Sequence, residues 1–405
     1  MLRRQTMDLG RMTDGSKSRP TCLVYLPLSY NGRGPGETCV RLVEQFASAG
    51  LTAKLFLPRA RNSVPRGISL VQTLPPPLRR FPWRFASRYA GRSLDASFGA
   101  ALRGADPSST VAYFWPTPPR HLLDLAASRG IPIVREMINT AISTAKPILD
   151  AAYRHFGLEP SHPADASGVE RERTELPAYD YISAPSTEVE ESLVRMGIDP
   201  AKILRTSFAW LPSRFPPQSA VRKSHFRALF VGMIGVRKGV LELLDAWEEA
   251  GVKGELLLVG QVEPAVADRV AKSLGKNGVS HQPFTSDLNA LYRSADVFIF
   301  PSREEGAPLV VYEAAGCGLP VITTPMGAAR LVDHGTTGLI VAPGNVPELA
   351  AAIRHLADDQ EARESMAAAS EAAAAQFTFE RVGKRRGELL REIALGRMPA
   401  KQSFG

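Results

Sequence analysis

The sequence predicts an α/β protein of two Rossmann-like domains in series, and three observations lead to that fold class. Short apolar runs alternate with stretches of helical period along almost the whole chain, which is typical of βαβ units. The strand candidates are nearly continuous in apolar residues, as expected of parallel strands buried on both faces. The chain of 405 residues is too long for one ordinary core, and its pattern starts afresh after a proline-rich, basic linker at 211–224.

The predicted elements follow one another in a similar order in both halves. A strand at 21–28 leads through a glycine-rich loop, 31–36, into a helix at 37–49. Further strands of the first half are expected at 52–58, 110–115, 131–135 and 181–184. In the second half, strands are expected at 227–232, 255–260, 297–301 and 320–323, and helices at 240–250, 264–274, 347–357 and 379–395, with an alanine-rich helical stretch that ends at residue 375. Two such domains leave a cleft between them, where ligands bind at the carboxyl ends of the strands.

The composition excludes several other classes of protein. Apolar residues make up 44% of the chain and charged residues 22%, which is typical of a globular protein. No apolar run approaches the roughly 18 residues of a membrane-spanning helix. The polar first 19 residues lack the apolar core of a signal peptide, so we expect a loose N-terminal arm and a cytoplasmic protein. Three scattered cysteines predict reduced thiols, with neither a disulfide framework nor a structural zinc site.

The net charge of +8 is concentrated in the first part of the chain. Residues 1–110 hold 17 Lys and Arg against 6 Asp and Glu, whereas the rest of the chain holds 32 against 35. This basic part predicts an anionic partner, such as a membrane face or a phosphorylated acceptor. No motif that reads bases accompanies it, so we expect no nucleic-acid partner.

A loop and helix at 302–316 carry the most informative chemistry. The strand at 297–301 runs into a loop that contains Glu305, and Pro308 is expected to start the next helix. The backbone amides at this helix start form an anion site, and Gly306 should let a phosphate or sugar approach the main chain. Glu313 lies about one and a half turns into the helix, where its carboxylate can accept both hydroxyls of a ribose. The expected ligand contacts of this segment are Gly306, Ala307, Pro308, Leu309 and Glu313.

A second motif, FVGMIGVRKG at 230–239, places positive charge at another strand end. The strand leads into a turn with Gly232 and Met233, and Arg237 and Lys238 then open a helix. A basic pair at a helix start opposes the helix dipole, and it is favourable where an anion binds. A leaving group with two phosphates needs this electrostatic stabilisation. An ordinary helix start is the alternative interpretation.

The two glutamates and their flanks resemble the retaining family-4 glycosyltransferases of the group 1 type. Glu305 and Glu313 form the E-x7-E spacing of that family, between the flanks ADVFIFPS and EAAGCGLPVITT. The resemblance implies the GT-B fold, in which two Rossmann-like domains face each other across a cleft. It implies transfer of a hexose from a UDP- or GDP-sugar to an acceptor hydroxyl with retention of configuration. By the same resemblance, Glu313 holds the ribose, Glu305 lies against the donor sugar, and Lys238 with Arg237 neutralises the diphosphate.

The family resemblance also suggests the domain organisation. We expect an arm at 1–19, an acceptor domain at 20–212, a nucleotide-sugar domain at 213–377, and a helix and tail at 378–405 that cross back. Neither a cofactor nor a metal is implied, because the chain has no DxD-type pair of the kind that holds a metal in other transferases. The implied acceptor is a saccharide or a lipid-linked saccharide, as in cell-surface glycan synthesis.

The acceptor side is expected at the loops that follow the first-half strands. The glycine-rich loop contributes Gly34 and Gly36, and the segment after the strand at 131–135 contributes Glu136 and Asn139, which should face the cleft. Relatives often carry a histidine there, and this chain has only His121 and His155 nearby. Relatives also often carry an arginine where Met233 stands. These departures keep an alternative open, a catalytically inactive GT-B scaffold that binds a glycan or a membrane.

The segment 78–92, LRRFPWRFASRYAGR, has two adjacent rows of side chains at helical spacing. Phe81, Phe85 and Tyr89 form one row, and the other row consists of Arg80, Arg84, Arg88 and Arg92. An aromatic row beside an arginine row suits a helix that lies on anionic lipid, at the inner face of a membrane. A domain helix with its aromatic side chains in the core is the alternative interpretation.

Overall fold

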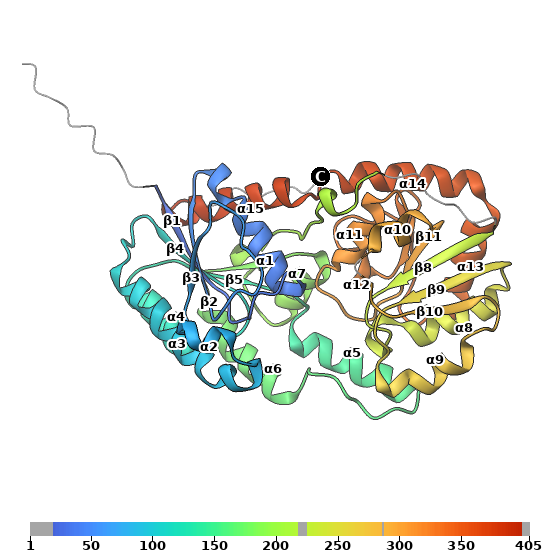
Figure 1. The fold of residues 1–405 in the computed structure, drawn as a ribbon, viewed down its shortest axis with the longest axis horizontal. Coiled ribbons are helices and arrows are strands. Elements are labelled where there is room, and N and C mark those ends of the chain that lie inside the picture. Colours follow the sequence, from blue (N-terminus) through green and yellow to red (C-terminus); the bar gives the residue numbers. More distant parts are fainter. Residues whose placement is uncertain (1–18, 218–224, 286, 399–405) are drawn as a thin grey trace, which may run out of the picture.

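The structure is a computed structural model that describes residues 19–217, 225–285 and 287–398. Two parallel sheets, each covered by helices, lie end to end along the molecule (Figure 1). This arrangement confirms the predicted α/β class with two Rossmann-like sheets. The predicted arm lies almost wholly outside the described residues, as do residues 218–224 of the linker and the end of the tail. None of the helices in the described ranges combines the length and apolar character that a bilayer-spanning helix needs.

The N-terminal sheet has seven strands in the order β3-β2-β1-β4-β5-β6-β7, and every pair is parallel. Its strands are β1 (Thr21–Tyr25), β2 (Thr52–Leu57), β3 (Ser69–Gln72), β4 (Thr110–Phe114), β5 (Ile133–Glu136), β6 (Tyr181–Ala184) and β7 (Ile203–Arg205). Its helices are α1 (Gly34–Glu44), the 3₁₀ turn η1 (Phe46–Ala49), α2 (Pro76–Arg80), α3 (Trp83–Gly104), α4 (Arg120–Ser128), α5 (Ile142–His155), α6 (Ala166–Glu175) and α7 (Thr187–Arg195). The four strands that the sequence predicted after the first strand in this half correspond to β2, β4, β5 and β6.

The C-terminal sheet has six parallel strands in the order β10-β9-β8-β11-β12-β13. Its strands are β8 (Phe226–Val231), β9 (Gly254–Val259), β10 (Val279–Gln282), β11 (Val297–Phe300), β12 (Val321–Thr323) and β13 (Gly338–Ile340). Its helices are α8 (Val240–Ala250), α9 (Ala267–Ser273), α10 (Leu288–Arg293), α11 (Leu309–Gly316), α12 (Pro325–Ala328), α13 (Val346–Asp358) and α14 (Gln360–Ala374). In both sheets the strand order reverses at β1 and β8, which places ligand sites at the carboxyl ends of these strands.

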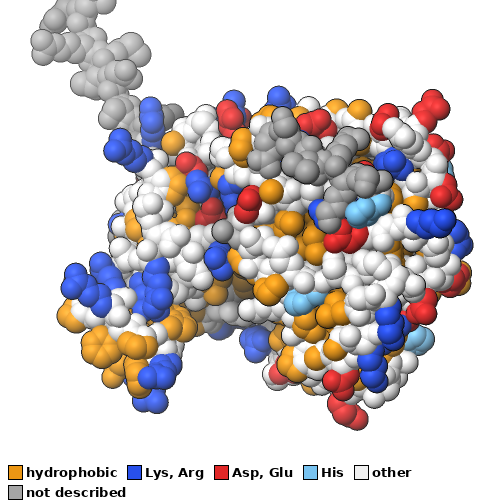
Figure 2. Space-filling view, turned by 45° about the vertical axis from the view of Figure 1, so that its right-hand side comes forward, with side chains coloured by type: hydrophobic (Ala, Val, Ile, Leu, Met, Phe, Trp, Pro, Cys, Tyr) orange, Lys and Arg blue, Asp and Glu red, His pale blue; other side chains and the backbone are white. Residues whose placement is uncertain are grey.

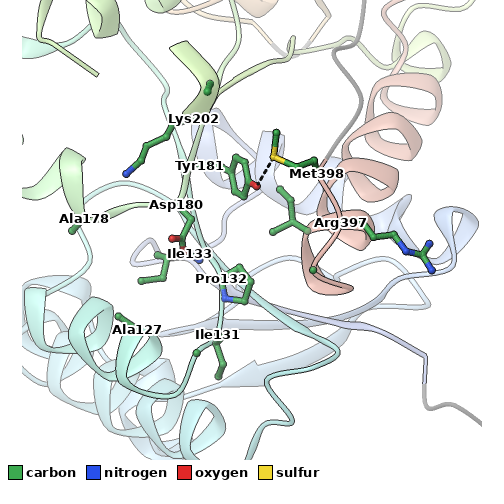
Figure 3. Close-up of a pocket in the computed structure, with 14 residues that line it drawn as sticks. Ala127, Ile131, Pro132, Ile133, Ala178, Asp180, Tyr181, Lys202, Arg397 and Met398 are labelled. Carbon is green, nitrogen blue, oxygen red and sulfur yellow. Dashed lines mark hydrogen bonds between the residues drawn. The ribbon is translucent and has the colours of Figure 1, made fainter. Parts of the chain in front are cut away.

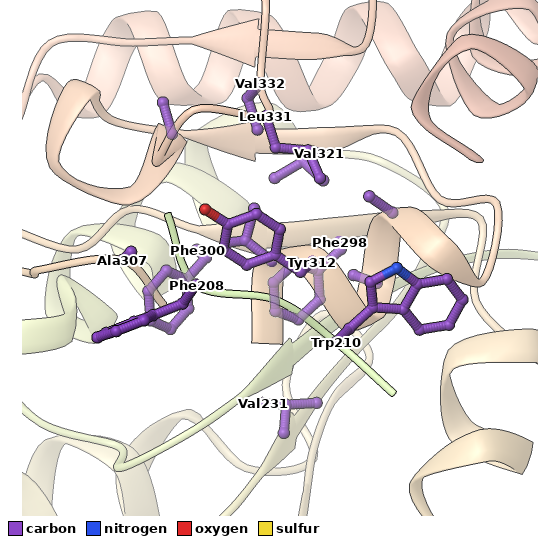
Figure 4. Close-up of a cluster of buried hydrophobic side chains, with 14 of the residues drawn as sticks. Phe208, Trp210, Val231, Phe298, Phe300, Ala307, Tyr312, Val321, Leu331 and Val332 are labelled. Atoms are coloured by element: carbon purple, nitrogen blue, oxygen red, sulfur yellow. The ribbon is translucent and has the colours of Figure 1, made fainter. Parts of the chain in front are cut away.

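The chain passes between the halves at two places, and these two passages are hydrogen-bonded to each other. The amide of Trp210 donates to the carbonyl of Phe377 at 3.0 Å, and the amide of Phe379 donates to the carbonyl of Trp210 at 3.1 Å. Figure 4 shows Phe208 and Trp210 among buried side chains of the C-terminal half, such as Tyr312. A continuous cluster of buried apolar side chains therefore includes residues of both halves.

The last helix, α15 (Phe379–Ala394), returns to the N-terminal half and packs on α1 and η1. The contact is close at Gly387, where an added Cβ would lie 2.8 Å from the Cβ of Ala49. Arg386 of this helix reaches into the N-terminal sheet, where it pairs with Glu136 and donates to the hydroxyl of Tyr113 at 2.7 Å. The side chains of Arg386 and Glu136 are 1% and 0% exposed, so both charges are removed from water.

This buried pair predicts a large loss of stability when one partner is removed. Glu136→Ala should lower the free energy of unfolding by about 3 to 5 kcal/mol, because it leaves Arg386 buried without a countercharge. Urea denaturation of the variant and the parent measures the difference.

The matched control is Asp124→Ala, which removes one carboxylate from the ion pair Arg120–Asp124, whose side chains are each 60% exposed. This substitution should leave the unfolding curve nearly unchanged, because water and salt screen an exposed pair. Equal effects of the two substitutions would contradict a structural role for the buried pair.

Candidate active site

Two adjoining cavities lie in the cleft between the carboxyl ends of the two sheets. Their volumes are about 420 and 540 Å³, and both are lined by Gly34, Gly232, Met233 and Leu309. Gly34 begins the helix after β1, whereas Gly232 directly follows β8. Segments far apart in the sequence therefore meet at one site, because the strands of each sheet are parallel and end at the same edge.

Lys238 and Glu305 face each other in the smaller cavity. The ammonium group of Lys238 contacts the carboxylate of Glu305, which also accepts a hydrogen bond from the hydroxyl of Ser302 at 3.1 Å. Burial lowers the pKa of Lys238 well below its usual range, and the neighbouring Arg237 acts in the same sense. The contact with Glu305 favours the charged ammonium. This corner of the cavity therefore combines a cation and an anion at the ends of two adjacent strands.

Arg237 makes its strongest contacts with protein groups. Its Nε donates to the carboxylate of Glu304 at 2.8 Å, and its Nη2 donates to Oδ1 of Asn139 at 3.1 Å. The same Glu304 accepts a hydrogen bond from the hydroxyl of Thr140 at 2.8 Å. Arg237 and Glu304 thus connect the loop after β11 with the loop after β5, across the cleft. Glu304 was not among the predicted site residues, although its place in the SREEGAP loop beside Glu305 was a usable signal.

Gly306 has a different role from the one expected. A Cβ at this position would lie 2.0 Å from the carbonyl oxygen of Ile138, so the backbone that comes close is that of the N-terminal half. Gly306 lines neither cavity, whereas Ala307, Pro308 and Leu309 do. The requirement for glycine therefore comes from packing between the halves. Helix α11 begins at Leu309, directly after Pro308, and its first turn faces the cavities.

Glu313 lines the larger cavity and is almost completely buried. Its carboxylate accepts a hydrogen bond from the hydroxyl of Tyr292 at 3.2 Å. Burial raises the pKa of Glu313 to about 7, against the opposing effect of the nearby Arg214 guanidinium. A carboxylate held in this way can accept hydrogen bonds from a ligand that enters the cavity.

The predicted acceptor-side residues separate into two groups. Gly34 and Asn139 line the smaller cavity. Gly36 is buried within α1 and lines neither cavity. The expectation that Glu136 faces the cleft is wrong. Glu136 is the last residue of β5, and its side chain points to the sheet face that α15 covers, where it pairs with Arg386.

Further residues of the cleft follow predicted strands or lie in the predicted linker. Trp115 directly follows β4, Gln261 lies just beyond β9, and Arg214 belongs to the linker. Phe284 lines the larger cavity, and the guanidinium of Arg33 lies 4.8 Å from its ring centroid, across the cleft. The signal for Trp115 was its place at the carboxyl end of a predicted strand.

The two histidines that the sequence offers near the acceptor side lie away from the cleft. His121 and His155 are both exposed on helices of the N-terminal half and line neither cavity. Among the described residues, the structure has no group of three or more His, Cys, Asp or Glu side chains that could hold a metal ion.

Another open cavity, of about 570 Å³, lies at the opposite edge of the N-terminal sheet (Figure 3). It is formed at the amino ends of strands by residues such as Ile133, Tyr181 and Lys202, together with Met398 after α15. None of the predicted site residues lines it. Apart from Gly36, Gly306 and Glu136, the predicted site residues line the cavities of the cleft between the sheets.

Comparisons with known proteins agree with this arrangement. The family "Glycosyl transferase 4-like domain" matches residues 33–208, and the family "Glycosyl transferases group 1" matches residues 225–359. The D-inositol 3-phosphate glycosyltransferase of Paenarthrobacter aurescens (strain TC1) is 30% identical over 188 residues, which are 44% of this chain and 46% of that protein. This chain thus matches less than half the length of that relative.

Solved structures show the same fold over nearly the whole chain. Anabaena Alr3699/HepE, in complex with UDP and glucose, aligns with a TM-score of 0.64 at 18% identity over 92% of this chain and 99% of that one. WaaG, a glycosyltransferase involved in lipopolysaccharide biosynthesis, aligns with a TM-score of 0.63 at 18% identity over 91% and 99%. Because the two family matches cover consecutive halves of the chain, it belongs to the group 1 (GT4) glycosyltransferase family, and it has the GT-B fold.

Proposed function

We propose that the protein is a retaining hexosyltransferase that moves a sugar from a nucleotide diphosphate sugar to an acceptor hydroxyl. One observation carries the proposal: the cleft brings Lys238, the start of α11 and the buried carboxylate of Glu313 to adjoining cavities. The diphosphate of a nucleotide sugar needs the positive charge of Lys238 and the backbone amides at the start of α11. The adjoining ribose needs a hydrogen-bond acceptor such as the carboxylate of Glu313.

The larger cavity suits the nucleoside of the donor. Glu313 supplies an acceptor for the ribose hydroxyls, and Phe284 offers an aromatic face at the cavity wall. A structure of the same fold, HepE, was solved with UDP and glucose, which supports a UDP-sugar over a GDP-sugar. In the smaller cavity, which Glu305 lines, we propose that its carboxylate accepts hydroxyls of the donor sugar.

The proposed reaction breaks the bond between the anomeric carbon and the diphosphate oxygen. The negative charge that develops on the diphosphate is stabilised by Lys238 and by the backbone amides at the start of α11. The acceptor hydroxyl attacks the anomeric carbon from the face that the diphosphate leaves, so configuration is retained. The proton of that hydroxyl passes to the departing phosphate oxygen, and neither a protein nucleophile nor a metal ion is required.

The acceptor side of the cleft is formed by the N-terminal half. Gly34, Thr38, Trp115 and Asn139 line the smaller cavity opposite Lys238. An aromatic ring and a side-chain amide are suited to bind a saccharide. We propose an acceptor in cell-surface glycan or lipid-linked saccharide synthesis, and the similarity of fold to WaaG supports this choice.

Release of nucleotide diphosphate from a panel of donor sugars tests the proposal. Purified protein should hydrolyse or transfer from at least one UDP- or GDP-sugar, at the same rate with and without EDTA. A strict requirement for Mn²⁺ or Mg²⁺ would contradict the metal-free reaction. Binding of UDP without turnover of any donor would favour the inactive-scaffold alternative.

Removal of the cation at the diphosphate should slow the reaction. Lys238→Ala should lower kcat by about 100-fold or more, because the developing anion loses a stabilising charge. The exposed Lys272 on α9 provides the control, since Lys272→Ala removes the same charge outside the cleft. Equal kcat in the parent and in Lys238→Ala would exclude Lys238 from the diphosphate site.

The raised pKa of Glu313 predicts that nucleotide affinity depends on pH. The empty site holds the proton below pH 7, whereas ribose hydroxyls favour the carboxylate, so binding should strengthen as pH rises. Affinity for UDP should increase roughly tenfold between pH 6 and pH 8, because about a tenth of the carboxylate is ionised one unit below its pKa.

Calorimetry of UDP binding at several pH values measures this dependence. The phosphates of UDP titrate in the same range, so Glu313→Gln serves as the reference. This variant should bind more weakly at pH 8 by roughly 10-fold to 100-fold, and only the dependence that UDP itself contributes should remain. Parallel pH profiles for parent and variant would show that Glu313 does not bind the ribose.

A further inference from the structure

The start of α3 exposes large aromatic side chains on one face. Phe81, Trp83, Phe85 and Tyr89 are 52%, 37%, 48% and 56% exposed. The alternative interpretation, that these aromatic residues fill a core, is therefore wrong. In the first turns of α3, the side that faces the protein carries the smaller residues Ala86, Ala90 and Leu94, so the aromatic rings of this part project outward.

Arginines surround these rings, and acidic residues are absent from this part of the sequence. Arg80, Arg84, Arg88 and Arg92 are all exposed, and within the described residues none of them pairs with a carboxylate. Between residues 45 and 94 the sequence has nine Lys and Arg and no Asp or Glu. We call the four aromatic residues and the four arginines the arginine–aromatic face. Figure 2 shows orange side chains ringed by blue ones on a projecting lobe at the lower left, over α2 and α3.

A buried arginine holds this face in shape. Arg59, which follows β2 and is 2% exposed, donates to the carbonyl of Phe81 at 2.6 Å and to that of Arg79 at 3.1 Å. Its guanidinium also lies 4.8 Å from the centroid of the Trp83 ring. These contacts fix the turn between α2 and α3, so the exposed rings are presented by ordered backbone.

From these observations we propose that the arginine–aromatic face docks on an anionic lipid bilayer. Aromatic rings beside arginines suit the boundary between headgroups and acyl chains, where rings insert and guanidinium groups bind phosphates. The face projects from the protein and lines none of the cavities described above. Single-stranded nucleic acid is bound in grooves, and a projecting face favours a flat lipid surface instead.

The location of the face relates docking to the cleft. Helix α2 follows β3 directly and so starts from the carboxyl edge of the N-terminal sheet. Gly34 and Asn139 extend from the same edge into the cleft. Docking would thus bring the acceptor side of the cleft toward the bilayer. The acceptor then belongs to the class of lipid-linked saccharides, an assignment that rests on the proposed function, whereas docking itself does not.

Sedimentation with vesicles tests the docking of the full chain. The parent should bind vesicles of phosphatidylcholine and phosphatidylglycerol at 70:30 and should not bind pure phosphatidylcholine, and salt should weaken the binding. Changing Arg80, Arg84, Arg88 and Arg92 to Gln should weaken it at least 100-fold, since each arginine near the surface contributes about fivefold. The control changes four exposed cations elsewhere to Gln, namely Lys253, Lys272, Lys276 and Arg381.

A second variant separates the rings from the charge. This variant keeps every arginine and combines Phe81→Ser, Phe85→Ser and Tyr89→Ser. It should still weaken vesicle binding at least tenfold, because the inserted apolar area is lost. Both variants of the arginine–aromatic face should keep the parent affinity for UDP. Unchanged UDP affinity would show that the variants are folded and that donor binding is separate from docking.

Trp83 provides a direct readout of insertion. The other three tryptophans, Trp115, Trp210 and Trp247, are buried, so a blue shift of fluorescence on adding anionic vesicles reports Trp83. Trp83→Phe should remove that shift without preventing sedimentation. The proposal is overturned if the parent ignores anionic vesicles, if the control weakens binding as much as the arginine variant, or if the protein binds single-stranded RNA but no vesicle.

Discussion

The hydrogen bonds between the two passages of the chain fix how the halves of this protein face each other. Trp210 lies on the first passage and is bonded through its backbone to Phe377 and Phe379 on the second. Its indole also donates to the carbonyl of Ala374 at 2.9 Å, and its ring fills the space beside Gly316, where an added Cβ would lie 2.3 Å away. Since both connections meet at one place, the opposite walls of the cleft extend from this shared attachment.

Side chains complete the attachment across the cleft. Arg237 and Glu304 bind the loop that holds Asn139, and Arg330, after α12, pairs with Glu190 on α7. Residues beside the expected diphosphate site therefore also hold the halves together. The partner of Arg330 is a carboxylate of the N-terminal half.

The sequence was sufficient to predict the inner strands of both sheets, but it was insufficient to predict their edge strands. Strands β3, β7, β10 and β13 are the four edge strands, and none was predicted. An edge strand is covered less completely, so its residues need not form the apolar run on which the prediction depended. Glu136 was misplaced for a related reason: sequence shows where a strand ends, but not which face its last side chain points to. Glu305 and Glu313 both line the cleft because both follow the end of β11, a strand that the sequence does show.

The return of α15 has a consequence for the order in which the protein forms. Its residues complete the layer over α1 and supply the countercharge for Glu136, yet they are synthesised after the entire C-terminal half. When the N-terminal half emerges from the ribosome, a buried carboxylate and a helical layer still lack their partners. Domains usually fold as units during synthesis, N-terminal first. Here the first half can complete its helical layer and its buried ion pair only after translation has passed the second half.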